Sequence, residues 1–179
     1  PDEIREVSVA VTEQGQELRL SVTQERLTVL LDRRRHLTGR TGCGVCGAET
    51  VEDAIRQPPP VAAGGRLAHS DLLHCLQALR AAQPLGGQTG SLHAAAWVDW
   101  QGRIELVRED VGRHNALDKL IGSRFLAGTL PANDTILFLS GRASFELLQK
   151  AVMAGIPVVC AVGAPSSLAI AAAKEFGVT

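Results

Sequence analysis

Two cysteines, Cys43 and Cys46, are separated by two residues in the glycine-rich segment Thr41-Gly42-Cys43-Gly44-Val45-Cys46-Gly47. Because glycine restrains the backbone very little, this composition predicts a mobile, exposed loop that presents two sulfur atoms. A cysteine reacts as its thiolate, which must reach a partner and is stabilised by nearby positive charge. The loop provides the reach, and Arg40 together with Arg33-Arg34-Arg35-His36 provides the charge. Thiol chemistry is therefore the first activity that the sequence indicates.

The Cys-x-x-Cys pattern fits several kinds of chemistry, and its spacing alone does not choose among them. In a sulfur relay, a thiolate attacks a donor persulfide and a nearby sulfur assists the release to an acceptor. In a dithiol redox site, the two sulfurs form a disulfide. A closed structural zinc site needs four ligands, and the other cysteines, Cys75 and Cys160, stand alone, so zinc would require pairs from two chains. An inert loop is the remaining interpretation.

The overall composition limits the classes of function. A chain of 179 residues fits one domain, or one domain with an appendage. The net charge of −1 argues against broad binding to a nucleic-acid backbone, and no apolar run approaches the roughly 20 residues of a membrane span. No signal peptide is visible, and two of the four cysteines are solitary, unlike a secreted disulfide framework. We expect a cytoplasmic protein without nucleic-acid or membrane partners. Because the sequence starts and stops abruptly, we also expect a fragment of a longer protein.

The first part of the chain predicts a small β structure. Apolar and polar residues alternate in residues 7–11 and again in residues 18–22, which indicates a β-hairpin with one buried face. Residues 27–31 form a short apolar piece that leads into the basic run. Three consecutive prolines, Pro58-Pro59-Pro60, then indicate an irregular connector. We therefore assign residues 1–60 to an N-terminal β hairpin part that carries the cysteine loop.

Residues 61–179 predict an α/β domain, because buried strands alternate with helices and the last two strands imply a parallel pair. Several expected helices carry capping or closing residues, for example Ser70 at the start of one and Gly177 after another. The expected helices cover residues 70–82, 113–125, 144–154 and 166–176. The expected strands cover residues 93–100, 103–108, 135–139 and 157–162, of which the first two form a hairpin. Residues 84–90 are expected to form a loop.

A dense group of polar residues, 110–119, lies where one of these helices begins. The amides after Gly112 offer backbone donors to an anion, and Arg113 suits a phosphate. Asp118 can accept hydrogen bonds from a guanine edge. The alternative is a capped helix start, with a buried, hydrogen-bonded His114 and with Asp118 in solvent.

Two further turns follow buried strands, at residues 140–144 and 163–167. In α/β sheets, ligands bind outside the carboxyl ends of the strands, and helix amides together with Arg142 suit a phosphate there. The alternative is a pair of ordinary strand-to-helix turns with serine N-caps. His93, at the start of a strand, either lines a cleft or is a hydrogen-bonded structural histidine.

Two segments together resemble the FdhD family, the accessory sulfurtransferases of formate dehydrogenase: Cys43-Gly44-Val45-Cys46-Gly47 and Arg108-Glu109-Asp110-Val111-Gly112-Arg113-His114-Asn115-Ala116-Leu117-Asp118-Lys119. Further matches come in the order of the family. They are Thr89-Gly90, His93-Ala94-Ala95-Ala96, Ser140-Gly141-Arg142, Gln149-Lys150-Ala151, Met153-Ala154-Gly155-Ile156-Pro157 and Ala164-Pro165-Ser166-Ser167-Leu168-Ala169.

The resemblance implies a sulfurtransferase with a cysteine persulfide intermediate. Such proteins accept sulfur from a cysteine desulfurase and pass it to the molybdenum cofactor, in its bis-molybdopterin guanine dinucleotide form, before insertion into the formate dehydrogenase catalytic subunit. The implied fold resembles the cytidine deaminases, with helices on a mixed sheet, and the implied assembly is a homodimer. Family chains have a longer N-terminal β region and continue beyond Thr179 into a further strand and a basic, glycine-containing segment.

The resemblance also implies roles for particular residues. Cys43 is the expected persulfide carrier and Cys46 its partner, with no tightly bound metal. Guanine nucleotide binding is expected as part of cofactor binding. The residues expected to bind the cofactor are His93, Asp110, Gly112, Arg113, His114, Asn115, Asp118, Ser140, Arg142, Ser144, Ser166 and Ser167.

Zinc deaminases use His-x-Glu followed by Pro-Cys-x-x-Cys. Here His93-Ala94-Ala95 lacks the glutamate and the cysteine pair precedes the histidine, which argues against their zinc-water mechanism. Two rival functions remain open. One is a non-catalytic chaperone that holds the molybdenum cofactor and delivers it to its enzyme. The other is a nucleotide-binding α/β domain whose cysteines bind metal.

Overall fold

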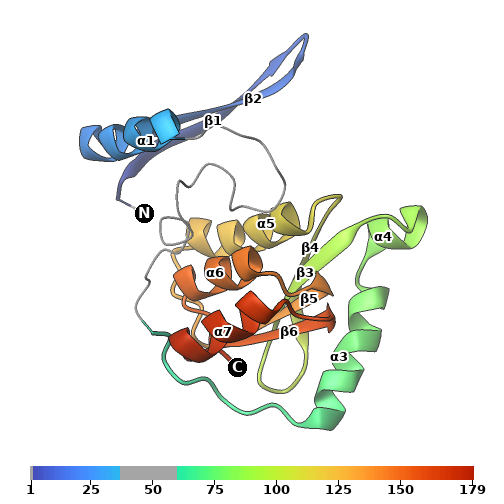
Figure 1. Ribbon diagram of the computed structural model, residues 1–179. Coiled ribbons are helices and arrows are strands. Elements are labelled where there is room, and N and C mark those ends of the chain that lie inside the picture. The colour runs from blue at the N-terminus through green and yellow to red at the C-terminus, as the bar shows by residue number, and fades with distance from the viewer. Residues whose placement is uncertain (1, 37–59) are drawn as a thin grey trace. The chain divides into compact units, whose positions relative to one another are not determined.

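The computed structural model describes residues 2–36 and 60–179. The chain divides into two compact units, Pro1–Ile55 and Arg56–Thr179, which are described separately below (Figure 1). Both Cys43 and Cys46 lie outside the described residues. Within the described ranges, every helix is too short or too polar to cross a membrane.

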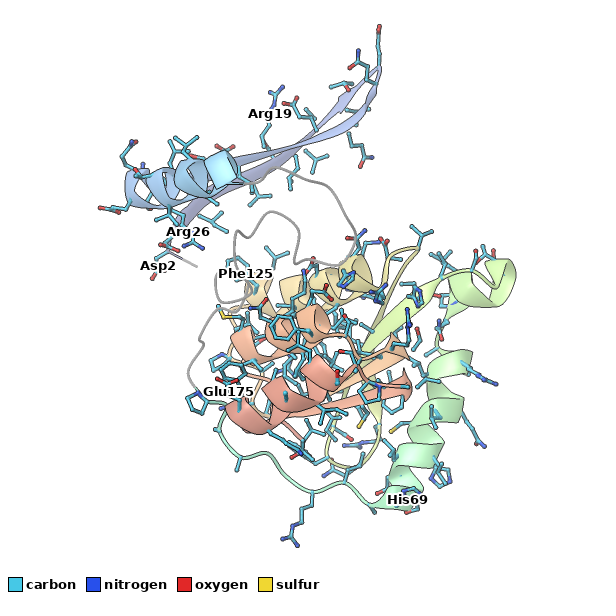
Figure 2. The ribbon with its side chains drawn as sticks, viewed as in Figure 1. Asp2, Arg19, Arg26, His69, Phe125 and Glu175 are labelled. Carbon is cyan, nitrogen blue, oxygen red and sulfur yellow. The ribbon has the colours of Figure 1, made fainter. Side chains whose placement is uncertain are left out.

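The first unit contains the predicted hairpin. Strand β1 (Ile4–Thr12) pairs antiparallel with β2 (Gly15–Val22), and Val9 stands opposite Leu18. One face of the hairpin is polar and carries the Arg19–Glu17 ion pair at 2.9 Å (Figure 2). The other face carries Val7, Val9, Leu18 and Leu20, which are between 50% and 61% exposed. The hairpin is confirmed, but the prediction that one of its faces is buried is wrong for the described chain.

A helix, α1 (Gln24–His36), follows the hairpin. The sequence pattern predicts only a short apolar piece at residues 27–31, so most of this helix was not predicted. The helix has little apolar periodicity, since its first turn is charged and its last turn is the basic run. Thr23 marks its start, where the Leu27 N–H donates to the Thr23 carbonyl at 2.9 Å and the Arg26 N–H donates to Thr23 Oγ1 at 3.4 Å. Leucine and arginine both have a high helix propensity, which favours a helix over this whole segment.

The second unit is built on a four-stranded sheet in the order β4-β3-β5-β6. The strands are β3 (His93–Val98), β4 (Ile104–Asp110), β5 (Ile136–Arg142) and β6 (Val158–Gly163). Strand β3 is antiparallel to β4 and β5, while β5 and β6 are parallel, as predicted. The carboxyl ends of β4, β5 and β6 therefore meet the start of β3 at one edge. We call this the carboxyl edge; it is marked by His93, Asp110, Arg142 and Gly163.

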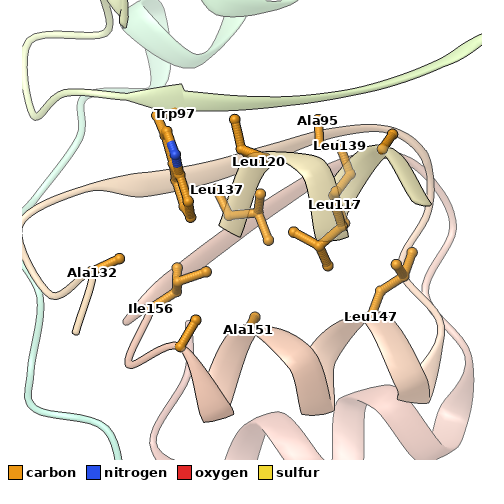
Figure 3. Packing of buried hydrophobic residues seen from close by; sticks show 12 residues of the cluster. Ala95, Trp97, Leu117, Leu120, Ala132, Leu137, Leu139, Leu147, Ala151 and Ile156 are labelled. Carbon is orange, nitrogen blue, oxygen red and sulfur yellow. The ribbon is translucent and has the colours of Figure 1, made fainter. Parts of the chain in front are cut away.

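Helices cover both faces of the sheet. Alternate residues of β3 and β5, among them Trp97 and Leu137, are buried against α5 (Arg113–Leu126) and α6 (Phe145–Met153) (Figure 3). Residues of the opposite parity, such as Ala96 and Phe138, are buried against α3 (His69–Ala81). The last helix, α7 (Ser167–Phe176), packs on α6. This is a three-layer α/β arrangement, in which apolar alternation in the strands fixes which face receives which helix.

Two expected local features are wrong. Helix α3 begins at His69 with Ala68 as its N-cap, so Ser70 lies in the first turn and caps nothing. Residues expected to form a loop instead form the short helix α4 (Pro84–Thr89). A distant carboxylate explains this helix, because Glu109 accepts hydrogen bonds from the N–H groups of Leu85 at 3.1 Å and Gly86 at 2.7 Å. Acceptors at the first turn stabilise a helix that has no intrahelical partners there.

Both tryptophans of the chain lie in this unit. Trp97 is 2% exposed, and the guanidinium carbon of Arg124 lies 5.1 Å from the centroid of its ring. Trp100 is overlaid by the connector before α3. A Cβ atom on Gly65 would lie 2.7 Å from a ring atom of Trp100, so the chain passes here only because residue 65 has no side chain.

Candidate functional site

The carboxyl edge brings together most of the residues that the sequence singled out. The starts of α5, α6 and α7 lie beside the ends of β4, β5 and β6, since each helix follows its strand after a short turn. The predicted residues that lie at this edge or in the first turns of these helices are His93, Asp110, Gly112, Arg113, His114, Asn115, Ser140, Arg142, Ser144, Ser166 and Ser167. Asp118 lies one turn further along α5. Cys43 and Cys46, which lie outside the described residues, keep their role as a prediction.

Asp110 organises the turn between β4 and α5. Its Oδ1 accepts hydrogen bonds from the Gly112 N–H at 2.8 Å and from Asn115 Nδ2 at 3.2 Å. Its Oδ2 lies 2.6 Å from Lys119 Nζ. The hydrogen bond from Lys119, followed by that from the Gly112 amide, lowers the pKa of Asp110 from 3.8 to about 2. Both of its oxygens are thus engaged within the fold, and Asp110 positions the helix start that carries Arg113.

We expect Asp110→Asn to destabilise the second unit by about 1–2 kcal/mol at pH 7, because hydrogen bonds to a charged acceptor are lost. The folded pKa is below the unfolded one, so the native carboxylate contributes stability above about pH 4 and loses it as the pH falls toward 2. Urea unfolding at pH 7, 4, 3 and 2 measures this. Equal stability of the variant and the native protein at pH 7, or an equal loss between pH 4 and 2, would contradict the assignment.

Arg113 and His93 flank a glycine on β5. A Cβ atom on Gly141 would lie 3.2 Å from His93 Nδ1 and 3.8 Å from Arg113 Cδ. The Nε atom of Arg113 is buried and has no hydrogen-bond partner among the described residues. Because a buried donor without a partner is costly, an acceptor that reached this atom would be stabilising.

Arg142 lies at the end of β5, is exposed and stands opposite Gly163 of β6. A Cβ atom on Gly163 would lie 2.7 Å from Arg142 Cγ and 3.0 Å from the Arg142 backbone nitrogen. The two strand ends are tied further by the Ser166 N–H, which donates to the Ala143 carbonyl at 3.0 Å. Arg113 and Arg142 therefore provide two guanidinium groups at one sheet edge, and within residues 60–179 neither forms an ion pair with a carboxylate.

The serines of the edge have local structural partners. Ser140 Oγ accepts a hydrogen bond from the Ala94 N–H at 2.8 Å, which links β5 to β3. Ser166 Oγ accepts from the Ala169 N–H at 3.2 Å and caps α7, as the alternative interpretation expected. Ser144, the N-cap of α6, donates instead to Glu146 Oε2 at 2.7 Å. Ser167 is exposed at the first position of α7.

The remaining predicted residues of α5 face α6. His114 Nε2 lies 3.4 Å from Glu146 Oε2. The two oxygens of Asp118 lie 2.5 Å and 2.6 Å from Lys150 Nζ, so the group expected to accept hydrogen bonds from guanine is paired with a lysine here. The sequence interpretation missed Glu146, Lys150 and Lys119. Lys119 and Lys150 carried a signal, since both lie in segments singled out from the sequence, residues 108–119 and 149–151.

These features define the class of protein: a three-layer α/β domain with two arginines at the carboxyl edge of its sheet that form no ion pair with a carboxylate within residues 60–179, in a chain that also carries a Cys-x-x-Cys pair. The chain belongs to the FdhD/NarQ family, whose sequence model matches residues 1–179. The resemblance found in the sequence is thereby confirmed.

Individual relatives agree with this membership. The chain is 45% identical to "Sulfur carrier protein FdhD" of Xanthomonas euvesicatoria pv. vesicatoria, over 99% of this chain and 63% of that protein. It is 43% identical to the protein of the same name from Bordetella petrii, over 99% of this chain and 64% of that protein. Among solved structures, it resembles a protein assigned as a formate dehydrogenase accessory protein from Desulfotalea psychrophila, with a TM-score of 0.68, 27% identity, and coverage of 99% of this chain and 64% of that one. The chain thus spans a little under two thirds of the length of these relatives.

Proposed function

We propose that this chain is part of a sulfur carrier that serves the maturation of formate dehydrogenase. The observation that carries the proposal is the family match over residues 1–179 together with relatives named as sulfur carrier proteins. In detail, Cys43 takes sulfur from a cysteine desulfurase as a persulfide, with Cys46 as its partner. The sulfur then passes to the bis-molybdopterin guanine dinucleotide form of the molybdenum cofactor, for the formate dehydrogenase catalytic subunit. The proposal includes a cytoplasmic homodimer and a sheet domain like that of cytidine deaminases.

The first step of the proposed relay is a thiolate exchange. The Cys43 thiolate attacks the terminal sulfur of the donor persulfide, a new sulfur–sulfur bond forms on Cys43, and the donor cysteine leaves as its thiolate. No external oxidant or reductant is consumed in this step. Cys46 lies three residues further along the sequence and is the nearest candidate to assist release of the sulfur.

The carboxyl edge supports the proposed cargo. A guanine dinucleotide carries phosphate oxygens, which need charged or polar donors. Arg113 Nε is a buried donor without a partner in the described chain, and Arg142 is exposed at the same edge. At Gly141 a Cβ atom would lie 3.2 Å from His93 Nδ1 and 3.8 Å from Arg113 Cδ, so the side chains of both residues adjoin this glycine. These groups fit an oxyanion. Asp110 and Asp118 are each paired with a lysine, Lys119 and Lys150, so their negative charge is offset.

Gly141→Ala tests the edge as a nucleotide site, with guanosine diphosphate as the probe. We expect the affinity to fall about tenfold, or ~1.4 kcal/mol, because the added methyl group displaces the His93 ring and narrows the space beside Arg113. Isothermal titration calorimetry measures the affinity. The matched control is Gly122→Ala in α5, where the new methyl group meets no atom within 4 Å. Equal affinities of the two variants would count against a nucleotide at this edge.

Intact-protein mass spectrometry tests the sulfur carriage itself. After incubation with a cysteine desulfurase and cysteine, we expect a gain of about 32 Da per sulfur atom, reversed by a reductant, as a persulfide requires. Absence of the adduct, with an active desulfurase shown in parallel, would reject the relay. The second candidate, a chaperone that only holds the cofactor, is favoured by one observation: Arg113 and Arg142, which form no ion pair with a carboxylate within residues 60–179, suit the phosphates of a bound cofactor whether or not sulfur is transferred.

A further inference from the structure

A second group of side chains lies beside the candidate site, where the first turns of α5 and α6 meet. His114 Nε2 and Ser144 Oγ both approach the same atom, Glu146 Oε2, at 3.4 Å and 2.7 Å. The side chains of His114 and Glu146 are 25% and 14% exposed. Two polar groups thus converge on one oxygen, although neither Glu146 nor this contact was expected from the sequence.

The chemistry of the partners fixes the direction of the histidine contact. An ionised carboxylate only accepts hydrogen bonds, so His114 Nε2 must carry the hydrogen. In the neutral imidazole the other nitrogen, Nδ1, is then a bare acceptor. Within the described chain, Nδ1 makes no hydrogen bond of its own. A contact of 3.4 Å is long for a hydrogen bond.

The position of the pair in the two helices sets it apart from a merely structural contact. One turn further along both helices, Asp118 pairs with Lys150 and closes the junction. His114 and Glu146 are nearer the carboxyl edge, because α5 and α6 both begin there. His114 also follows Arg113 directly, so an acceptor and an unpartnered donor are adjacent at one helix start.

We propose that Glu146 is a positioning residue of this site. It holds His114 in the Nε2–H tautomer and so presents Nδ1 as the acceptor for a ring N–H of a bound nucleotide base. Arg113 supplies a donor for an oxyanion of the same ligand, and a nucleotide offers both groups. The inference rests on the proposed function, which it deepens by assigning the base-recognising group and the residue that orients it.

The test uses guanosine diphosphate as the probe and Glu146→Gln as the variant. The amide can also donate a hydrogen bond, so it no longer enforces one tautomer of His114. We expect the affinity to fall about tenfold, and the ¹⁵N spectrum of the His114 ring to change from a single Nε2–H form to a mixture. The control is Arg103→Met, which removes an exposed ion pair with Asp99 at the opposite end of β4 from the carboxyl edge. It should leave the affinity within about twofold and the ring spectrum unchanged.

A second variant, His114→Ala, separates the positioning role of Glu146 from an independent structural role. In His114→Ala the ring that Glu146 orients is absent. Adding Glu146→Gln to it should therefore cost no further affinity, whereas independent structural roles would give additive losses.

Three results would overturn the inference. They are an unchanged tautomer in Glu146→Gln, an unchanged affinity in that variant, or additive losses in the double variant. In each case the wild-type protein still binds the nucleotide, so the proposed function survives. If the wild-type protein does not bind guanosine diphosphate, the inference fails together with the nucleotide part of the proposed function.

Discussion

Replacing the first loop cysteine, in the variant Cys43→Ala, is expected to reduce the activation of formate dehydrogenase to the background level. The thiolate that takes the sulfur is then absent, and alanine cannot form a persulfide. The measurement is formate dehydrogenase activity in cells that lack their own sulfur carrier and receive the variant. Cys46→Ala is expected to cause a smaller loss, because its sulfur assists the exchange without receiving the sulfur first.

Cys160→Ala is the matched control for this experiment. Burial raises the pKa of the Cys160 thiol to about 11, so it remains protonated at neutral pH and is a poor nucleophile. We expect this variant to activate the enzyme normally. If variants at both loop cysteines also activate it normally, the sulfur relay is rejected and the cofactor-holding chaperone is retained.

The second large effect is on folding. Gly155 closes α6 with a φ of +75°, and a Cβ atom there would lie 2.5 Å from Pro131 Cβ. Gly155→Ala therefore adds backbone strain of about 1 kcal/mol and overpacking of about 1–3 kcal/mol. We expect a loss of about 2–4 kcal/mol in the free energy of unfolding, measured by urea denaturation.

Gly128→Ala separates these two contributions. Gly128 has a φ of +67°, but a Cβ atom there would meet nothing within 4 Å. Its replacement should cost only the backbone strain, about 1 kcal/mol. Equal losses at the two positions would show that Pro131 moves aside without cost, and that the tight contact at Gly155 does not contribute to the destabilisation.

Most of the sheet unit could be predicted, because its signals are local. Apolar runs located the strands, Ser166 and Gly177 bounded α7 as expected, and the parallel β5–β6 pair followed from the alternation of strands and helices. Helix α4 could not be predicted, because its first turn depends on Glu109, which is 23 residues away from Gly86. The buried face expected for the hairpin failed for a related reason: alternation indicates an apolar face and does not identify what covers it.

The location of the candidate site could be predicted from the sequence, but the role of each of its residues could not. Strand direction brings Arg113 and Arg142 to one edge, which the sequence order implies. Which polar groups are already paired depends on side chains from other elements. Lys119 and Lys150 engage the carboxylates of Asp110 and Asp118, and no spacing within residues 110–118 indicates this. The two loop cysteines lie outside the described residues, so their roles stay a prediction from the sequence.

The location of the aromatic side chains gives the protein a selective optical property. The chain has two tryptophans and no tyrosine, and both tryptophans lie in the unit Arg56–Thr179. Indole fluorescence therefore originates from the sheet unit alone, and the hairpin unit makes no contribution to the emission. Trp97 is shielded from water beneath Arg124, so its emission should shift to longer wavelength as the core opens. The unfolding of the sheet unit can thus be followed by its tryptophan fluorescence without a label, because the hairpin unit adds no tryptophan emission.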